Sequence, residues 1–204
     1  MGGDVEHAFE LIEETLKKTV AALRDSRVPF LLGGSLATWV RGGPESRKDL
    51  DVMVKPDDAE RALEALERAG MRPERPPEEW LYKAWDGDVL VDVIFEPRGI
   101  EMTDDVIERG EEVHVLGITI PVMSLEDVLT TKLLSIDEHE LDYSSVLRMA
   151  RVLREQIDWR ALRAATAESP IACAFFVLVE ELGIVSDTGA GGADVRVLTP
   201  RGSG

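Results

Sequence analysis

The sequence predicts an α/β (α+β) protein in which a small mixed sheet, with helices on one side, precedes a helical C-terminal half. Three observations support this fold class. A strand–turn–helix–strand pattern occupies residues 28–54, and hairpin signals lie within residues 80–95 and 113–121. Beyond residue 122, apolar residues recur only at helical spacings. Strands followed by a run of helices are the order expected of an α+β fold.

The length of 204 residues allows one large domain, or one domain with a helical appendage. We expect an α/β core over residues 1–122, a helical subdomain over 123–185 and a disordered, Gly-rich tail over 186–204. The sequence contains no apolar run long enough to span a bilayer, and its N-terminus lacks the pattern of a signal peptide. A cytoplasmic protein without membrane contact is therefore expected.

The N-terminal half alternates helices with short strands. Apolar residues spaced by three and four positions predict an amphipathic first helix. Pro56, followed by two acidic residues, predicts the start of a later helix that ends before Gly70. In order, we expect a helix over residues 5–24, a strand over 28–32, a short helix over 35–41, a strand over 50–54 and a helix over 56–69.

Two hairpins should complete the sheet. Residues 71–79 contain three prolines and are expected to form a connector. Asp86-Gly87 is a typical two-residue hairpin turn, so residues 80–85 and 88–95 should pair as antiparallel strands. A second, shorter hairpin is expected around Gly117.

The C-terminal half should be all helical. Ser124, with Asp127 three residues later, is typical of a helix N-cap. We expect helices from Ser124 to about Ile136, and over residues 143–156, 158–165 and 171–182. Cys173, the single cysteine, lies in the last of these and is expected to be a buried, inert thiol.

The most informative motif is the Gly33-Gly34-Ser35 turn, followed on the second strand by Asp49 and Asp51. Side chains alternate along a strand, so the two acids should point to the same face. Without a cation between them, one carboxylate should have a raised pKa, and Mg²⁺ would remove that conflict. The glycines let the backbone approach a phosphate, and Ser35 can donate a hydrogen bond. The motif therefore indicates a phosphate cradle beside a metal dyad.

Asp92 interrupts the otherwise apolar strand from Leu90 to Ile94. A lone buried carboxylate is unfavourable unless it is paired or bound to metal, which makes Asp92 a candidate third ligand. The structural alternative is that Asp92 faces solvent on an edge strand, with Asp49 and Asp51 as ordinary strand-end acids.

The net charge of −17 is unevenly distributed. Residues 101–142 hold twelve acidic and two basic side chains, whereas residues 144–204 are neutral overall. Such a chain is a poor general binder of nucleic acid, although a local basic groove is not excluded. The acidic block is either solvated surface or a docking face for a basic partner. The three histidines show no zinc spacing, so any metal site should consist of oxygen ligands.

The Gly-Gly-Ser turn, the Asp-x-Asp pair and the third aspartate together resemble the nucleotidyltransferase superfamily of the polymerase-beta fold, over about residues 28–165. The details look most like the AbiEii/MenT-type toxin nucleotidyltransferases. These share a Gly-Gly-[Ser/Thr]-x-Ala opening, a later helix that carries a lysine, here Lys132, and an aspartate that opens the next helix, here Asp142. Many relatives have Ser or Thr two residues before the first aspartate, where this chain has Arg47.

By this resemblance, the turn of Gly33, Gly34 and Ser35 would hold the β- and γ-phosphates of an NTP. Asp49 and Asp51 would bind two Mg²⁺ ions that bridge the triphosphate. The resemblance also implies that Asp92 helps to bind the second ion and orients or deprotonates the attacking hydroxyl. Two metals can clamp the attacking and leaving oxygens of such a transfer.

Three basic residues are candidates for contact with the nucleotide. Arg47 and Lys48 lie beside the aspartate dyad. Lys132 is the sole Lys or Arg within residues 110–142, and its neighbours on a helix would be apolar. The residue either reaches the phosphates or base, as the resemblance implies, or extends from an apolar face to solvent.

Two further features could contact an RNA. Arg148, Arg151 and Arg154 recur at three-residue spacing, which alternatively indicates a solvated helix face or pairing with acids. Trp80 and Tyr82 should share one face of their strand, where they either stack a base or form a sheet–helix core contact.

The resemblance implies a Mg²⁺-dependent enzyme that transfers a nucleoside monophosphate from an NTP to the tRNA 3′ end, as the toxin of a toxin–antitoxin pair. One alternative is a small-molecule nucleotidyltransferase that resembles the aminoglycoside- or lincosamide-modifying enzymes, because an acidic groove would suit a cationic drug. Another is an inactive nucleotide-binding or interaction module, against which the three intact aspartates argue.

Overall fold

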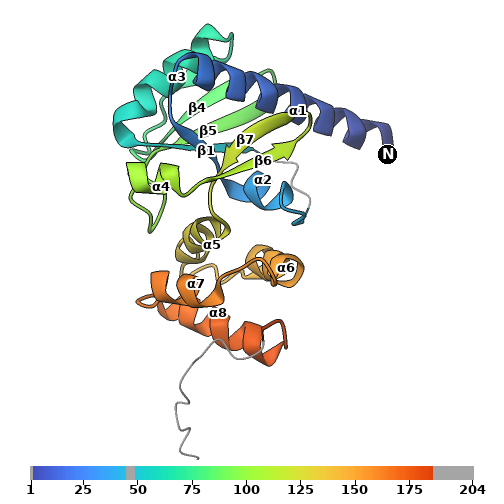
Figure 1. Ribbon diagram of the computed structural model, residues 1–204, viewed down its shortest axis with the longest axis vertical. Coiled ribbons are helices and arrows are strands. Elements are labelled where there is room, and N and C mark those ends of the chain that lie inside the picture. The colour runs from blue at the N-terminus through green and yellow to red at the C-terminus, as the bar shows by residue number, and fades with distance from the viewer. Residues whose placement is uncertain (1, 45–48, 186–204) are drawn as a thin grey trace, which may run out of the picture.

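The computed structural model of the chain describes residues 2–44 and 49–185, and its centre is a mixed sheet of seven strands (Figure 1). The strands are β1 (Phe30–Leu32), β2 (Leu50–Val54), β3 (Arg72–Glu74), β4 (Leu81–Asp86), β5 (Val89–Ile94), β6 (Glu111–Val115) and β7 (Ile118–Val122). They lie in the order β3-β4-β5-β2-β1-β7-β6. The pairs β1–β7 and β2–β5 are parallel and the other four pairs are antiparallel. The predicted mixed sheet is therefore confirmed.

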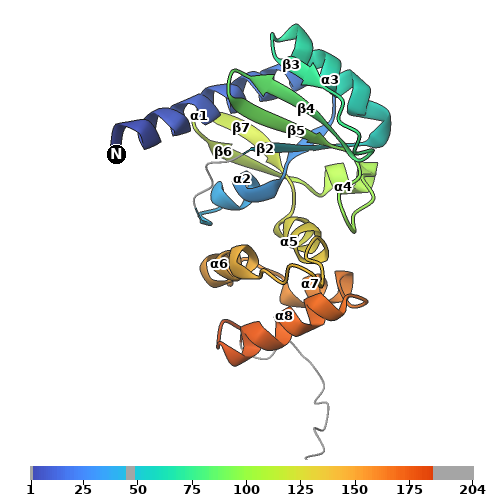
Figure 2. The ribbon, with the colours of Figure 1, turned by 180° about the vertical axis from the view of Figure 1, so that it is seen from behind.

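Helices lie on both faces of this sheet. They are α1 (Gly2–Asp25), α2 (Gly34–Trp39), α3 (Ala59–Arg68), which follows the 3-10 turn η1 (Pro56–Asp58), α4 (Asp104–Glu108), α5 (Leu125–Leu134), α6 (Ser144–Leu153), α7 (Trp159–Ala165) and α8 (Pro170–Glu181). Helices α1 and α3 cover one face, whereas α2 and α5 lie beneath the other (Figures 1 and 2). The expectation of helices on one side was therefore incomplete. None of the helices described is both long and apolar enough to cross a bilayer.

The amphipathic patterns explain why α1 and α3 pack as they do. Leu16, Val20 and Leu23 of α1 and Leu63 and Leu66 of α3 are all buried in one cluster with the sheet. Residues three and four positions apart share one side of a helix, so each helix presents a single apolar stripe to the sheet. This packing fixes the strands whose ends carry the predicted site.

Two short elements were not predicted. Strand β3 lies within the proline-containing connector and pairs antiparallel with β4 at the edge of the sheet. Pro73 is tolerated there because an edge strand needs only half of its backbone donors for pairing. Helix α4 is only one turn long, too short to produce a periodic pattern in the sequence.

Helix α5 belongs to two hydrophobic clusters. Val128 packs with the sheet and with helices α1 to α3, whereas Leu125, Leu129 and Leu133 pack with α6, α7 and α8. The side chain of Ser124 accepts a hydrogen bond from the Asp127 N–H, which confirms the predicted N-cap. The boundary expected at residue 122 stays a prediction, because α5 is shared by both clusters.

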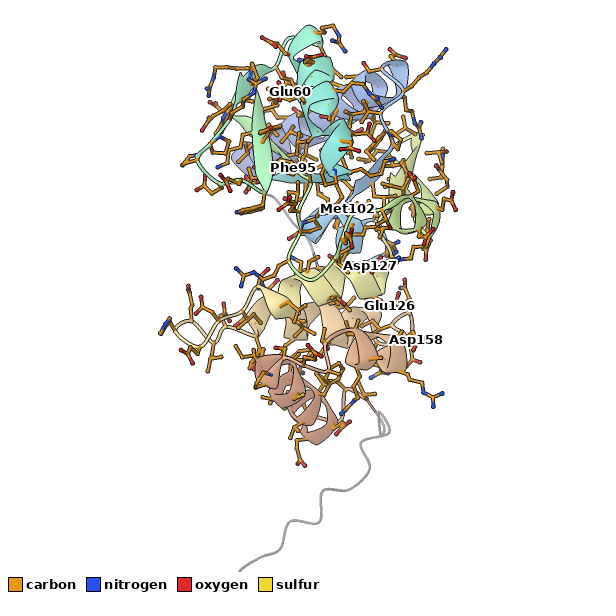
Figure 3. The ribbon with its side chains drawn as sticks, turned by 90° about the vertical axis from the view of Figure 1, so that its left-hand side faces the viewer. Glu60, Phe95, Met102, Glu126, Asp127 and Asp158 are labelled. Atoms are coloured by element: carbon orange, nitrogen blue, oxygen red, sulfur yellow. The ribbon has the colours of Figure 1, made fainter. Side chains whose placement is uncertain are left out.

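Two polar contacts anchor the start of α5, where Figure 3 labels Glu126, Asp127 and the facing Asp158. Arg109 donates from Nε and Nη2 to the carboxylate of Asp127, over 2.8 and 2.9 Å. On the other side, the Asp158 N–H donates to Glu126 Oε1 over 2.7 Å. The first contact ties α5 to the turn between α4 and β6, and the second ties it to α7.

The expectation for Cys173 was wrong, because its side chain is exposed. Helix α8 is apolar around most of its circumference, and packing selects only Ala172, Phe175, Phe176 and Val179 for burial. Composition alone could not tell which side of such a helix faces the protein. The predicted tail, residues 186–204, lies outside the described residues, and so do Arg47 and Lys48.

Candidate active site

The site begins with a row of side chains that crosses three strands. Asp51 on β2 is paired in register with Asp92 on the parallel strand β5, and Asp92 is paired with Lys83 on β4. Paired residues point to the same face of a sheet, so these charged groups are neighbours. Strand β5 lies between β4 and β2, so the alternative that placed Asp92 on an edge strand is wrong.

The glycines bring the end of β1 against Asp51. The Gly33 N–H donates to the carbonyl oxygen of Asp51 over 2.8 Å. Gly34 has a φ of +58°, and a Cβ atom there would lie 1.6 Å from Asp51 Oδ2. Only a residue without a side chain therefore allows the Asp51 carboxylate to pack directly on this turn. Ser35 follows at the second position of α2 and is half-buried.

The carboxylates compete for ionisation. Burial and the neighbouring Asp92 carboxylate raise the pKa of Asp51 to about 7, and Asp49 adds to the rise. Burial also raises the pKa of Asp92 to about 6, although the Lys83 ammonium opposes the shift. Asp49, which directly precedes β2, is exposed. The expected conflict between acids is present, and Asp92 contributes more to it at Asp51 than Asp49 does.

Lys132 approaches these acids from α5. Burial lowers the pKa of Lys132, and the Asp51 carboxylate opposes that shift. Lys132 is half-buried, and its helix neighbours Val128 and Leu129 are almost completely buried. Asp51 and Lys132 line the same cleft, although they are more than 80 residues apart in the sequence. Lys132 therefore brings a positive charge to the predicted site.

This cleft has a volume of about 370 Å³. Its walls come from the turn after β1, from β2 and β5, from the segment around Trp80 and from α5 and α6. The lining residues are Gly34, Asp51, Met53, Trp80, Ile94, Pro97, Arg98, Thr131, Lys132, Ser135, Ile136, Asp142, Ser145 and Val146. A cavity of this size accommodates a small ligand or part of a larger one.

Only some of the predicted site residues line the cleft. Gly34, Asp51 and Lys132 line the cleft itself, as does Asp142, which accepts a hydrogen bond from the Ser144 N–H over 2.8 Å before α6. The remaining described candidates, Gly33, Ser35, Asp49 and Asp92, are adjacent in the chain or in the sheet but do not line it.

The acids fit a hard divalent cation only in part. Within residues 2–44 and 49–185, no three side chains of His, Cys, Asp or Glu form a ready-made metal site. Asp92 Oδ1, however, is buried and has no hydrogen-bond partner in this part of the chain. An orphaned carboxylate oxygen beside the half-buried carboxylate of Asp51 matches the oxygen ligands that Mg²⁺ takes. Asp51 and Asp92, with Asp49 nearby, are the residues that would hold it.

Three residues of this region were missed by sequence reasoning. Lys83 and Arg98 belong to no motif. Ser135 lies at the end of the helix that carries Lys132, and only that lysine was predicted as a site residue. The alternation of β4 would have revealed Lys83, because residues paired across a hairpin share a face once the register is known. The turn that carries Arg98 gives no comparable signal.

The expectations for the aromatic and basic groups had mixed outcomes. Tyr82 packs on Phe95, with ring centroids 5.0 Å apart, which confirms the core interpretation. Trp80 does not share that role, because it precedes β4 and lines the cleft. Of the basic residues, Arg154 pairs with Glu155, whereas Arg148 and Arg151 are exposed.

The chain is similar to nucleotidyltransferases. Residues 8–180 match the model of a family described as an uncharacterised nucleotidyltransferase. No curated protein is similar enough to match. Among solved structures, ANT(2″)-Ia in complex with adenylyl-2″-tobramycin shares 16% identity, with 80% of this chain and 98% of that chain covered and a TM-score of 0.59.

Two other solved structures are more distant. The lincosamide antibiotic adenylyltransferase LnuA, bound to lincomycin, shares 16% identity over 75% of this chain and 97% of its own, with a TM-score of 0.49. A tRNA-processing enzyme shares 13% identity over 86% of this chain and 57% of its own, with a TM-score of 0.37. Similarity at such identities concerns the fold alone.

Proposed function

Because the chain belongs to this nucleotidyltransferase family, we propose that it transfers a nucleoside monophosphate from an NTP to an acceptor hydroxyl in the cleft between Asp51 and Lys132. One arrangement supports this placement above all. Asp51, with the glycine turn packed on its carboxylate, and Lys132 are half-buried and line a single cleft, and Asp92 lies beside Asp51 on the neighbouring strand. Charge neutralisation and positioning are what phosphoryl transfer requires from a protein.

The reaction forms one bond and breaks another. The acceptor oxygen attacks the α-phosphorus, the bond from that phosphorus to the bridging oxygen of the β-phosphate breaks, and pyrophosphate leaves with the electron pair. Asp92 would accept the proton of the attacking hydroxyl, a role supported by its buried Oδ1, which has no partner among the described residues. Lys83, its cross-strand neighbour, helps to keep that carboxylate ionised.

Mg²⁺ held by Asp49, Asp51 and Asp92 would neutralise the triphosphate and polarise the reacting oxygens. The turn of Gly33, Gly34 and Ser35 would let the backbone approach the phosphates.

Lys132 would face the phosphates from the other wall of the cleft and stabilise the negative charge of the leaving pyrophosphate. Arg47 and Lys48, from the adjoining segment outside the described residues, stay candidates for the same phosphates.

For the acceptor, we propose the tRNA 3′ end, with the protein acting as the toxin of a toxin–antitoxin pair. Exposed Arg148 and Arg151 on α6, the helix whose first turn lines the cleft, support contact with an RNA strand. The second candidate is a small cationic molecule. The acidic composition of the chain favours it, and the structure of ANT(2″)-Ia with adenylyl-2″-tobramycin provides a precedent on the same fold.

A transfer assay tests this function. Each of the four α-³²P-labelled NTPs is incubated with Mg²⁺ and total tRNA, beside an Asp49→Ala/Asp51→Ala control. Label that enters tRNA with the native protein alone supports the RNA acceptor and identifies the nucleotide. Pyrophosphate release that requires an aminoglycoside instead would support the small-molecule acceptor. Near-normal transfer by the double variant would contradict the assigned chemistry.

A further inference from the structure

A second cavity adjoins the cleft. It has a volume of about 410 Å³ and is lined by Trp80, Glu96, Arg98 and Ser135. Three of these residues, Trp80, Arg98 and Ser135, also line the cleft that holds Asp51, and we call them the Trp80 shelf. Because the two hollows share these walls, a molecule bound in the second cavity can extend into the first.

Trp80 combines a fixed backbone with an open ring. Its carbonyl oxygen accepts hydrogen bonds from the N–H groups of Phe95 and Glu96, over 3.1 and 3.2 Å. Its side chain nevertheless remains 44% exposed, in contrast to the buried Leu81 that follows it. A rigidly held, solvent-facing indole has no role in the core, but it is what stacking of a nucleobase requires.

Arg98 provides a free cation beside this ring. It occupies a turn in which the Ile100 N–H donates to the Pro97 carbonyl over 3.3 Å and Gly99 has a φ of +79°. Arg98 is exposed, and across residues 2–44 and 49–185 no carboxylate forms an ion pair with it and its guanidinium donates no hydrogen bond. An unpaired guanidinium that lines the same hollow as an exposed indole matches a phosphate that follows a stacked base.

The position of the Trp80 shelf indicates whether it binds the acceptor or the donor NTP. In an in-line transfer, the attacking hydroxyl and the leaving pyrophosphate lie on opposite sides of the α-phosphorus. In the strand order β4-β5-β2-β1, Gly34 follows β1 on one side of Asp51, whereas Trp80 precedes β4 on the other. If the pyrophosphate lies at the glycine turn, the shelf lies on the side of the attacking group.

We infer that the Trp80 shelf binds the acceptor, and that the acceptor is a nucleotide, whose base stacks on Trp80 and whose phosphate pairs with Arg98. This inference rests on the proposed function and narrows its substrate. A strand of RNA and a free nucleotide offer the same chemistry. An amino sugar has no aromatic ring to stack on Trp80, and Arg98 would repel its ammonium groups although Glu96 of the second cavity would attract them.

Binding measurements test the shelf directly. With the donor site filled by a non-hydrolysable NTP analogue and Mg²⁺, calorimetry records the affinity for an RNA tetranucleotide, for AMP and for tobramycin. Trp80→Ala should weaken nucleotide binding about tenfold, and Trp80→Phe should restore most of it. Arg98→Met should weaken binding and lower the salt slope by about one, whereas the matched control Arg68→Met on α3 should change neither.

The outcomes distinguish the inference about the Trp80 shelf from the proposed function. RNA bound much more tightly than AMP identifies a strand as the source of the nucleotide, and equal affinities identify a free nucleotide. The inference is overturned if the Trp80 and Arg98 variants bind both nucleotides normally, if tobramycin alone binds, or if the variants lose affinity for the NTP analogue instead. Failure of the native protein to bind any NTP analogue with Mg²⁺ would instead overturn the proposed function. Circular dichroism checks that Trp80→Ala is folded, and Arg98→Met provides an independent test because its side chain is exposed.

Discussion

A methyl group on Gly34 would lie 1.6 Å from Oδ2 of Asp51, so the second glycine of the turn and this carboxylate are in direct contact. Any side chain at residue 34 must displace the carboxylate or the turn. The glycine motif and the aspartate motif are therefore in direct contact in the fold, although Asp49 follows Ser35 by fourteen positions in the sequence.

Gly34→Ala should therefore reduce transfer by more than 100-fold, because a displacement of about 1 Å near the reacting atoms is expected to cost that much. The matched control is Gly87→Ala. Gly87 has a φ of +62°, close to the +58° of Gly34, but an added Cβ would meet nothing within 4 Å. The control should lose about 1 kcal/mol of stability through backbone strain and keep its activity. Equal loss of activity in both variants would show that strain, and not contact with Asp51, is responsible.

Asp51 should make the metal-free protein less stable as the pH rises. Its pKa is raised from the ordinary 3.8 to about 7, so the folded state binds the proton more tightly than the unfolded state does. The penalty for ionised Asp51 is absent below pH 3.8, grows between pH 3.8 and 7, and is complete above 7. Asp51→Asn should thus raise the free energy of unfolding at pH 8.5 by on the order of 2–4 kcal/mol, and much less at pH 4.5.

Urea denaturation in EDTA at the two pH values measures this difference. Asp88→Asn, which changes an exposed acid on the neighbouring hairpin, is the control. Added Mg²⁺ should stabilise the native protein at pH 8.5 and have little effect on Asp51→Asn. Parallel pH profiles for the native protein and Asp51→Asn would contradict the assigned burial of this carboxylate.

Lys132→Ala should lower kcat/KM by about 10- to 100-fold, since the half-buried cation proposed to face the triphosphate is lost. Lys132→Arg should retain part of the activity. Lys17→Ala serves as the control, because Lys17 pairs with Glu13 on the outer surface of α1. Steady-state kinetics with varied NTP would reveal a raised KM or a reduced kcat, and unchanged kinetics would refute the role of Lys132.

The Arg109–Asp127 contact should hold α5 in place. A double-mutant cycle with Arg109→Met and Asp127→Asn, measured by urea denaturation, should give a coupling of about 1 kcal/mol, because both hydrogen bonds are charge-assisted and Asp127 is nearly buried. The same cycle on the exposed pair Arg68–Glu64 should give a coupling of about 0.3 kcal/mol. Equal couplings would mean that the Asp127 contact is an ordinary surface ion pair.

Local patterns in the sequence were sufficient for most elements of this fold. Alternation and helical periodicity depend on neighbours along the chain, which is why the strand of Asp51 and the N-cap at Ser124 were predicted. The strand β3 and the outer face of α8 depend on tertiary packing. Edge pairing made a strand of a segment with proline at residue 73, and the choice of buried face exposed Cys173.

The residues of the candidate site also fall into those that local sequence patterns predict and those that depend on the tertiary fold. The glycine turn and the three aspartates carry signals at fixed spacing, so the sequence alone was enough to predict them as site residues. Lys83, Arg98 and Trp80 reach the site only because β4 and the turn after β5 fold beside it. Their role depends on strand register and on one turn, and neither can be derived from residue types alone.

Because α5 packs in both hydrophobic clusters, its position limits where a chimaera of this protein with a relative can be joined. A junction before α5 would separate Lys132 from the carboxylates, whereas a junction within residues 136–141 would leave Gly34, Asp51 and Lys132 together. A chimaera joined at the later point would keep the residues proposed to bind the donor and receive new residues at positions 142, 145 and 146 of the cleft wall. Under the proposed function, exchange of helical segments at that point would change the acceptor wall and leave the donor wall unchanged.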